Sequence, residues 1–208
     1  MNLNTKDKLR INLGCGTHLI DGFINVDLIN YLNCSGAHFV QQDLFIYIAS
    51  LEDSSVSLCL VSHVLEHLSH QEIVRFLDLI EKKLSADGVL EVYTPHPSNP
   101  YFYSDPTHKT PIGLHYFSYL VEKSALLRSI PKYSTNRLSL FNSRVRLLYR
   151  VPSFLRDYKF ISFPLRIIFK LFRVCFDTDK SILFVEINEY FLSNLIAPYE
   201  IYFEFKRC

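Results

Sequence analysis

The sequence predicts an α/β fold, in which helices cover both faces of a mostly parallel β-sheet. Short apolar segments alternate with loops and helical patterns in the first half of the chain. The segment 56–61 (VSLCLV) is apolar throughout, as expected of a strand buried on both faces. An amphipathic helical pattern separates it from the next apolar segment, 88–94. A strand, a crossover helix and a second strand imply that the two strands are parallel.

Taken in order, the apolar segments give a set of strands that end at loops. The predicted strands are 9–13, 23–27, 38–43, 56–61, 88–94 and 200–207. The segment 136–150 alternates in places, so it is either one bent strand or a hairpin. The segment 95–111 contains five prolines and is therefore expected to be a long loop.

The clearest helix lies between the fourth and fifth predicted strands. Its apolar residues recur at helical spacing and form one face: Ile73, Phe76, Leu77, Ile80 and Leu84. Ser69 and Glu72 form a capping box at its start. The sequence SADG, which ends at Gly88, is a stop signal. A further helix is expected at about 118–129.

Length and composition are those of one domain with a complete core. The chain has 208 residues, of which 49% are hydrophobic. It has no apolar run of about 18 residues, the length that a spanning helix needs, and no signal-peptide pattern at its start. Its five cysteines are widely spaced and form no C-x-x-C pair. This pattern argues against a disulfide framework and favours a reducing cytoplasm.

Charge is segregated along the chain although the net charge is only +1. Residues 128–176 contain eleven Lys or Arg and a single acid, Asp157. Within 163–176, basic residues recur at helical spacing beside apolar ones. A helix packed on the domain with a solvated basic edge explains this pattern, and so does an interfacial helix that contacts an anionic membrane through 159–176. Nucleic-acid binding is disfavoured because no recognised module is present.

Candidate ligand-binding residues follow the first four predicted strands. In parallel α/β sheets, ligands bind beyond the carboxyl ends of the strands. The residues at these ends are Gly14, Cys15 and Gly16, then Asp27, then Asp43 and Leu44, and finally Ser62 and His63. Glycines permit a sharp turn and close approach to a ligand, and a carboxylate can accept hydrogen bonds from ribose hydroxyls. Each residue alone has a structural interpretation as a turn or cap, but their ordered combination favours a nucleoside site.

At this point the sequence resembles a known family. The segments LRINLGCGTHLIDGFINVDL, QQDL, SHVLEHL and DGVLEVYTPHP are similar to those of class I S-adenosylmethionine-dependent methyltransferases. The resemblance is more specific to small members linked to glycan or polysaccharide synthesis, and it covers about residues 9–112. It implies a Rossmann-like, seven-stranded sheet whose last strand is antiparallel. The whole chain, 1–208, would then be one methyltransferase-like domain with a basic helical insertion at about 151–180.

The resemblance also implies roles for the residues at the strand ends. The loop Gly14-Cys15-Gly16 would face the methionine part of S-adenosylmethionine, and Asp27 would bind its ribose. Asp43 and Leu44 would lie by the adenine, while Ser62 and His63 would border both the cofactor and the acceptor. Two departures concern the first loop, which has His18 where a third glycine is usual and continues into a connection too short for a full crossover helix.

The segment SHVLEHL also matches H-x-x-E-H, a signature of one class of zinc peptidases. A zinc site needs His63 and His67 on one helical face, but the capping box places the start of the helix at Ser69, after both. No third ligand is apparent in a helical context downstream. We therefore expect residues 62–68 to form a turn in the wall of the cofactor cleft, and we expect no metal.

A separate Y-x-x-x-K pattern is typical of short-chain dehydrogenases. The glycine loop that accompanies it in that family is absent here, which disfavours a nicotinamide oxidoreductase.

The proline-rich loop supplies the candidate catalytic residues. It contains SDPTHKTPI, in which His108 and Asp105 could bind or deprotonate an acceptor hydroxyl, and His67 is a third candidate. The alternative is a proline-fixed lid in which Asp105 caps a turn and His108 is exposed. "DPTH" recurs in similar methyltransferases, which favours the catalytic interpretation.

The sequence thus predicts methyl transfer from S-adenosylmethionine to a small-molecule or glycan acceptor, with a hydroxyl oxygen as the nucleophile. An anionic or lipid-linked acceptor would suit the basic segment. Two alternatives stay open: a non-catalytic cofactor-binding or interaction protein with the same fold, and a nucleic-acid methyltransferase.

Overall fold

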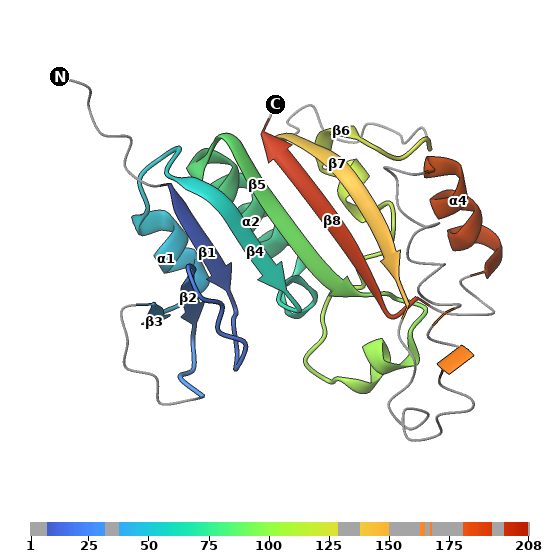
Figure 1. Ribbon diagram of the computed structural model, residues 1–208, viewed down its shortest axis with the longest axis horizontal. Helices are drawn as coiled ribbons and strands as arrows, with labels where there is room; N and C mark the ends of the chain where they lie inside the picture. Colours follow the sequence, from blue (N-terminus) through green and yellow to red (C-terminus); the bar gives the residue numbers. More distant parts are fainter. Residues whose placement is uncertain are drawn as a thin grey trace.

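The computed structural model describes residues 8–31, 38–128, 138–149, 163–164, 167, 181–192 and 198–207. Eight strands in these segments form one sheet with the order β3-β2-β1-β4-β5-β8-β7-β6 (Figure 1). The strands are β1 (Leu9–Leu13), β2 (Ile24–Asp27), β3 (Phe39–Gln41), β4 (Val56–Ser62), β5 (Leu84–Pro95), β6 (Val121–Ser124), β7 (Leu138–Leu148) and β8 (Glu200–Arg207).

Strand directions confirm the predicted α/β class. Strands β3, β2, β1, β4 and β5 are mutually parallel, and β8 is antiparallel to β5, as the resemblance implied. β7 is antiparallel to β8 and parallel to β6. The predicted count of seven strands is wrong by one, because the short strand β6 extends the sheet beyond β7.

The amphipathic helix is present as predicted. Helix α2 (His70–Lys83) begins at Ser69, whose hydroxyl accepts from the Glu72 amide while the Glu72 side chain accepts from the Ser69 amide. α2 ends without a glycine stop, since β5 begins directly at Leu84. The sequence did not predict helix α1 (Leu44–Ser50), which Asp43 caps through the amides of residues 45 and 46.

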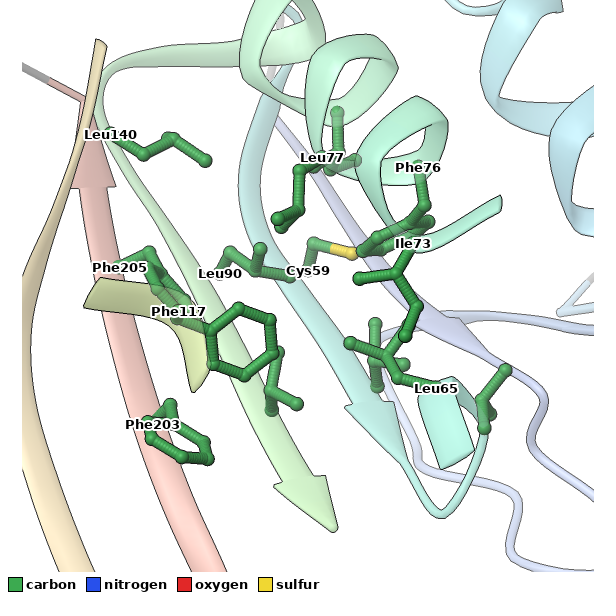
Figure 2. Close-up of a cluster of buried hydrophobic side chains, with 14 of the residues drawn as sticks. Cys59, Leu65, Ile73, Phe76, Leu77, Leu90, Phe117, Leu140, Phe203 and Phe205 are labelled. Carbon is green, nitrogen blue, oxygen red and sulfur yellow. The ribbon is translucent and has the colours of Figure 1, made fainter. Parts of the chain in front are cut away.

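The hydrophobic core lies between α2 and the sheet (Figure 2). Ile73, Phe76, Leu77 and Ile80 of α2 are almost fully buried, which confirms the predicted apolar face. They face alternate residues of the strands, among them Cys59 of β4 and Leu90 of β5 (Figure 2). Phe117, Phe203 and Phe205 continue this core with edge-to-face contacts at centroid distances of 4.8 and 5.0 Å.

The described helices do not cover both faces of the parallel strands equally. Figure 1 shows α1 and α2 behind the sheet, with α4 (Ile182–Ile187) beside β7 at the other end. In the part of the chain that the structure describes, the front of β1, β4 and β5 carries no helix. The residues on that front are partly polar, because strand alternation brings Asn12, Ser62 and Glu91 to it.

Two predictions for the second half of the chain have different outcomes. The helix expected at 118–129 is wrong: a 3-10 turn, η3 (Tyr116–Tyr119), leads into β6. Pairing with β7 satisfies the backbone groups of β6, and this outweighs local helical preference. Within the segment 136–150, residues 138–148 form one strand, β7, with a register shift between Asn142 and Arg144, so the bent-strand alternative is confirmed over this part.

The basic helical segment lies largely outside the described residues. Of the predicted helix 163–176, only residues 163, 164 and 167 are described, and these are helical and exposed. The insertion at 151–180 and the membrane-contacting segment 159–176 therefore stay predictions. None of the helices in the described part of the chain has the length and apolar character that a membrane crossing requires.

Candidate functional site

A cavity of about 780 Å³ lies at the carboxyl ends of the parallel strands. Its lining comes from β1 and the loop after it, from β4, β5 and β7, and from the start of β8. The lining residues are Asn12, Gly14, Cys15, Gly16, His18, Leu60, Ser62, His63, Glu91, Tyr93, Leu148, Tyr149, Tyr199 and Glu200. The volume is typical of small-molecule sites, which span about 300–1,000 Å³.

The glycine loop forms one wall of this cavity. Gly14 and Gly16 have φ angles of +66° and +53°, which disfavour residues with a Cβ. A Cβ on Gly14 would also collide with the Val64 side chain, so glycine is required there for close packing as well. Cys15 between them is buried.

Two buried asparagines hold the short connection between β1 and β2, which contains no helix. The Asn25 amide oxygen accepts from Asn12 Nδ2 at 2.9 Å and from the Ile20 amide at 2.9 Å. Its amide nitrogen donates to the carbonyls of Ile20, Phe23 and His38. Asn12 Nδ2 also donates to the His18 carbonyl at 3.0 Å. These side chains replace the hydrogen bonds that a crossover helix would make internally.

Asp27 ties the glycine loop to the end of β2 but does not line the cavity. Its Oδ2 accepts from the Gly16 amide at 2.7 Å, and its Oδ1 accepts from the Ile29 amide at 3.0 Å. Each carboxylate oxygen keeps capacity for a second donor, so a ribose contact is compatible with both bonds.

The residues predicted to lie by the adenine have structural roles in the described chain. The Asp43 carboxylate caps α1, and Leu44 is the first residue of that helix and packs against the core. Neither residue lines the cavity. Their expected contact with the cofactor stays a prediction.

His63 lies on the cavity wall between two buried carboxylates. Its Nε2 is 2.9 Å from Glu200 Oε1, and its Nδ1 is 3.2 Å from Glu66 Oε1. Glu66 and Glu200 are 0% and 3% exposed. The hydrogen bond to Glu200 and then that to Glu66 raise the pKa of His63 to about 9. Because both ring nitrogens face acceptors, the imidazole donates from both and carries a positive charge.

The three catalytic candidates gather in a second cluster outside the cavity lining. The rings of His67 and His108 are 4.8 Å apart between centroids, at an angle of 63°. Thr107 Oγ1 lies 2.9 Å from His67 Nδ1 and donates to Asp105 Oδ1 at 2.6 Å. The structure therefore brings His67, His108 and Asp105 together, but none of them lines the cavity.

Sequence reasoning missed nine lining residues. Only the ends of the first four strands were considered, although Glu91 and Tyr93 lie near the end of the fifth. The predicted antiparallel direction of β8 could have revealed the lining residues at the start of that strand. It places the start of β8, with Tyr199 and Glu200, at the same edge of the sheet as the ends of the parallel strands.

A cavity beyond the carboxyl ends of a mostly parallel sheet, bordered by a glycine loop, is typical of nucleotide- and cofactor-binding α/β proteins. No family model and no curated protein sequence matches this chain.

Solved structures are nevertheless similar to it. A S-adenosylmethionine-dependent methyltransferase from Archaeoglobus fulgidus aligns with 96% of this chain and 86% of its own, with 20% identity and a TM-score of 0.60. A protein from Listeria monocytogenes assigned to the same class aligns over 97% and 90%, with 14% identity and a TM-score of 0.50. The chain therefore has the fold of S-adenosylmethionine-dependent methyltransferases, and the predicted resemblance is confirmed at the level of the fold.

Proposed function

We propose that this protein transfers a methyl group from S-adenosylmethionine to a hydroxyl of a small-molecule or glycan acceptor. The observation that carries the proposal is the cavity of about 780 Å³ beside the glycine loop, in a fold shared with S-adenosylmethionine-dependent methyltransferases.

The chain has suitable groups for the cofactor. S-adenosylmethionine, when bound, supplies a methyl group already activated on a sulfonium sulfur. Gly14 and Gly16 line the cavity with backbone atoms alone, and Asp27 holds the Gly16 amide in place while keeping acceptor capacity. Ser62 and His63 end β4 on the cavity wall. These residues bind and orient the donor, so most of the catalytic effect is alignment of the acceptor with the methyl group.

The remaining walls suit an acceptor rich in hydroxyls. Three tyrosines, Tyr93, Tyr149 and Tyr199, and two glutamates, Glu91 and Glu200, line these walls. Aromatic faces pack against the apolar side of a sugar, while carboxylates accept hydrogen bonds from its hydroxyls. An anionic or lipid-linked acceptor drawn by the basic segment 128–176 extends this proposal, although most of that segment is outside the described residues.

A hydroxyl acceptor needs a base within hydrogen-bond reach. Of the histidines in the described chain, only His18 and His63 line the cavity, and both ring nitrogens of His63 face carboxylates. His18 is therefore the better placed candidate. His67, His108 and Asp105 do not line the cavity, so the catalytic roles predicted for them stay predictions.

We propose that the reaction takes place in the cytoplasm, since the five cysteines are widely spaced and form no C-x-x-C pair. Contact with an anionic membrane through 159–176 is part of the same proposal for a lipid-linked acceptor.

Calorimetric titration with S-adenosylmethionine and its demethylated product tests the cofactor assignment. Asp27→Asn should weaken binding about tenfold or more through loss of a charged acceptor. Asp21→Asn, on the exposed part of the same connection, is the matched control and should bind as the wild type does. If neither compound shows saturable binding to the wild type, the proposed methyltransferase activity is rejected.

Transfer of a radiolabelled methyl group to sugars, nucleotide sugars, lipid-linked sugars and RNA then tests the acceptor. Transfer to a sugar hydroxyl with a product stable to alkali supports an ether and the proposed reaction. Cofactor binding without transfer to any acceptor favours the non-catalytic alternative. Transfer to RNA that falls steeply with salt favours the nucleic-acid methyltransferase.

A further inference from the structure

Glu66, His67 and His108 form a cluster that the proposed methyl transfer does not use. Each offers one ligand atom, a carboxylate oxygen or a ring nitrogen, and these three atoms lie within 4.8 Å of one another. Glu66 and His67 belong to the 3-10 turn η1 (Leu65–His67) after β4, whereas His108 comes from the proline-rich loop.

The Glu66 carboxylate has one satisfied and one unsatisfied oxygen. The side chain is 0% exposed, and Oε1 pairs with His63 Nδ1 at 3.2 Å. Oε2 is buried and has no hydrogen-bond partner among the described residues. A buried carboxylate oxygen without a partner is costly, and in native proteins such a group points to a bound water or ion.

The hydrogen bonds of the two histidines leave one lone pair on each ring. His108 Nδ1 lies 2.7 Å from the Phe102 carbonyl, which can only accept, so this nitrogen carries the proton. The Thr107 hydroxyl donates its only proton to Asp105, so His67 Nδ1 donates to that hydroxyl. In the uncharged tautomer of each ring that fits these contacts, Nε2 is the nitrogen with a lone pair, and His108 Nε2 also lies 3.8 Å from Asp105 Oδ2. Hydrogen bonding of the opposite nitrogen to a carbonyl or a carboxylate-linked group is the usual arrangement around metal-binding histidines.

Backbone contacts hold the loop of His108 against η1. The amides of Lys109 and Thr110 donate to the Glu66 carbonyl at 2.7 and 3.1 Å. The Thr110 hydroxyl donates to the Leu68 carbonyl at 2.7 Å. The position of His108 relative to Glu66 is thus fixed by the fold and does not depend on a ligand.

We propose that Glu66, His67 and His108 bind a divalent transition-metal ion of the zinc type. Two imidazole nitrogens and one carboxylate oxygen suit Zn²⁺ or a related first-row ion, whereas Mg²⁺ and Ca²⁺ prefer oxygen ligands. Three protein ligands leave at least one coordination position open. The ion would neutralise Glu66 and join the proline-rich loop to the turn after β4.

The proposed site differs from the H-x-x-E-H interpretation. His63 is not a ligand, since its two nitrogens face Glu66 and Glu200. The third ligand is His108, which folding brings beside η1 from a loop rather than from a helix. The expectation of no metal rested on the start of the helix at Ser69 and on the lack of a third ligand in a helical context downstream. The proline-rich loop offers His108 as a third ligand without a helix. This proposal is independent of the methyltransferase activity.

Metal binding can be measured on the untagged chain after treatment with a chelator. Titration with Zn²⁺ by calorimetry should show one site per chain. Co²⁺ should give visible absorption bands of a site without thiolate charge-transfer absorption, because no cysteine is a ligand. His67→Ala and His108→Ala should each lower the Zn²⁺ affinity by about 100-fold or more. His70→Ala, an exposed histidine that contacts Tyr116, is the control and should keep the affinity.

The outcomes separate the proposal from its alternatives. No saturable Zn²⁺ binding, or binding unchanged in both His67→Ala and His108→Ala, would overturn the proposal and leave the Glu66 oxygen to a bound water. Glu66→Gln tests the carboxylate, and circular dichroism shows whether this buried variant folds; if it does not, the two histidine variants still decide. Cofactor binding is measured separately on the zinc-free chain, so its failure would reject the methyltransferase and not the metal site.

Discussion

His63 Nε2 lies 2.9 Å from Glu200 Oε1, so a histidine at the end of β4 holds a glutamate 137 positions later, at the start of β8. The other ring nitrogen, Nδ1, lies 3.2 Å from Glu66 Oε1. The backbone of His63 has a φ of +56°, a left-handed conformation that is uncommon for residues other than glycine. The hydrogen bonds outweigh this local cost and join two strands at the cavity wall.

Replacing His63 should therefore destabilise the fold. His63→Asn tolerates the left-handed backbone but removes the cation between two buried carboxylates. We expect a loss of about 2 kcal/mol in the free energy of unfolding, measured by urea denaturation. This is less than the about 3–5 kcal/mol of fully buried pairs, because 42% of the His63 side chain is exposed. His18→Asn, an exposed histidine on the same cavity, should change stability by less than about 0.5 kcal/mol. Equal losses of stability in the two variants would contradict a stabilising role for the contacts of His63 with Glu66 and Glu200.

The two glycines of the first loop should differ in their tolerance of a side chain. Gly16→Ala meets no neighbouring atom, so only its φ of +53° costs stability, by about 1–2 kcal/mol. Gly14→Ala adds a collision with Val64 to a φ of +66° and should cost about 2–5 kcal/mol. Thermal and urea unfolding of both variants measures the difference. A Gly14→Ala variant as stable as Gly16→Ala would show that β1 and Val64 can move apart.

The asparagine pair should account for the stability of the short connection. Asn25→Ala removes the acceptor of the Ile20 amide and the side-chain donor to the carbonyls of Ile20, Phe23 and His38. The Ile20 and His38 carbonyls keep a backbone donor, so the variant should cost about 2–3 kcal/mol and not more. Asn12→Ala removes two bonds and should cost less. In a double-mutant cycle, the shared bond of 2.9 Å should appear as a coupling of about 1 kcal/mol. A coupling near zero would mean that the two residues act independently.

His115 should make stability depend on pH. Both ring nitrogens are buried and have no hydrogen-bond partner among the described residues, and burial lowers the pKa of His115 below 6.5. The charged groups around it are Glu186, Arg128 and Glu189. The unfolded chain then binds the proton more tightly, so stability should fall as pH decreases through 6.5 and level off below the pKa of the folded state.

Urea midpoints of the wild type and His115→Asn between pH 5 and 7.5 check this expectation. The variant should lose the part of the pH slope that comes from His115, and His18→Asn, at an exposed position, should keep it. A slope that is the same in wild type and His115→Asn would show that His115 is hydrated or paired in solution.

Local sequence patterns predicted the elements whose signals are short-range. The capping box and the apolar face are properties of Ser69 and the fourteen residues of α2, and both were confirmed. The edge strand β6 was missed because its backbone partners are in β7. Helix α1 was missed although Asp43, its cap, had been noted as a residue that follows a strand.

The sequence by itself determined the α/β class, the parallel direction of β4 and β5 and the glycine loop, because hydrophobic periodicity and glycine conformational freedom are local properties. Only the tertiary structure decided the contacts of His63, Glu66, His67 and His108. The partners of these residues come from the start of β8 and from the proline-rich loop, which no spacing rule relates to the turn after β4. Burial explains these contacts, because the carboxylates of Glu66 and Glu200 are withdrawn from water and are stabilised by a nearby cation. The fold alone determines which cations lie close enough to them.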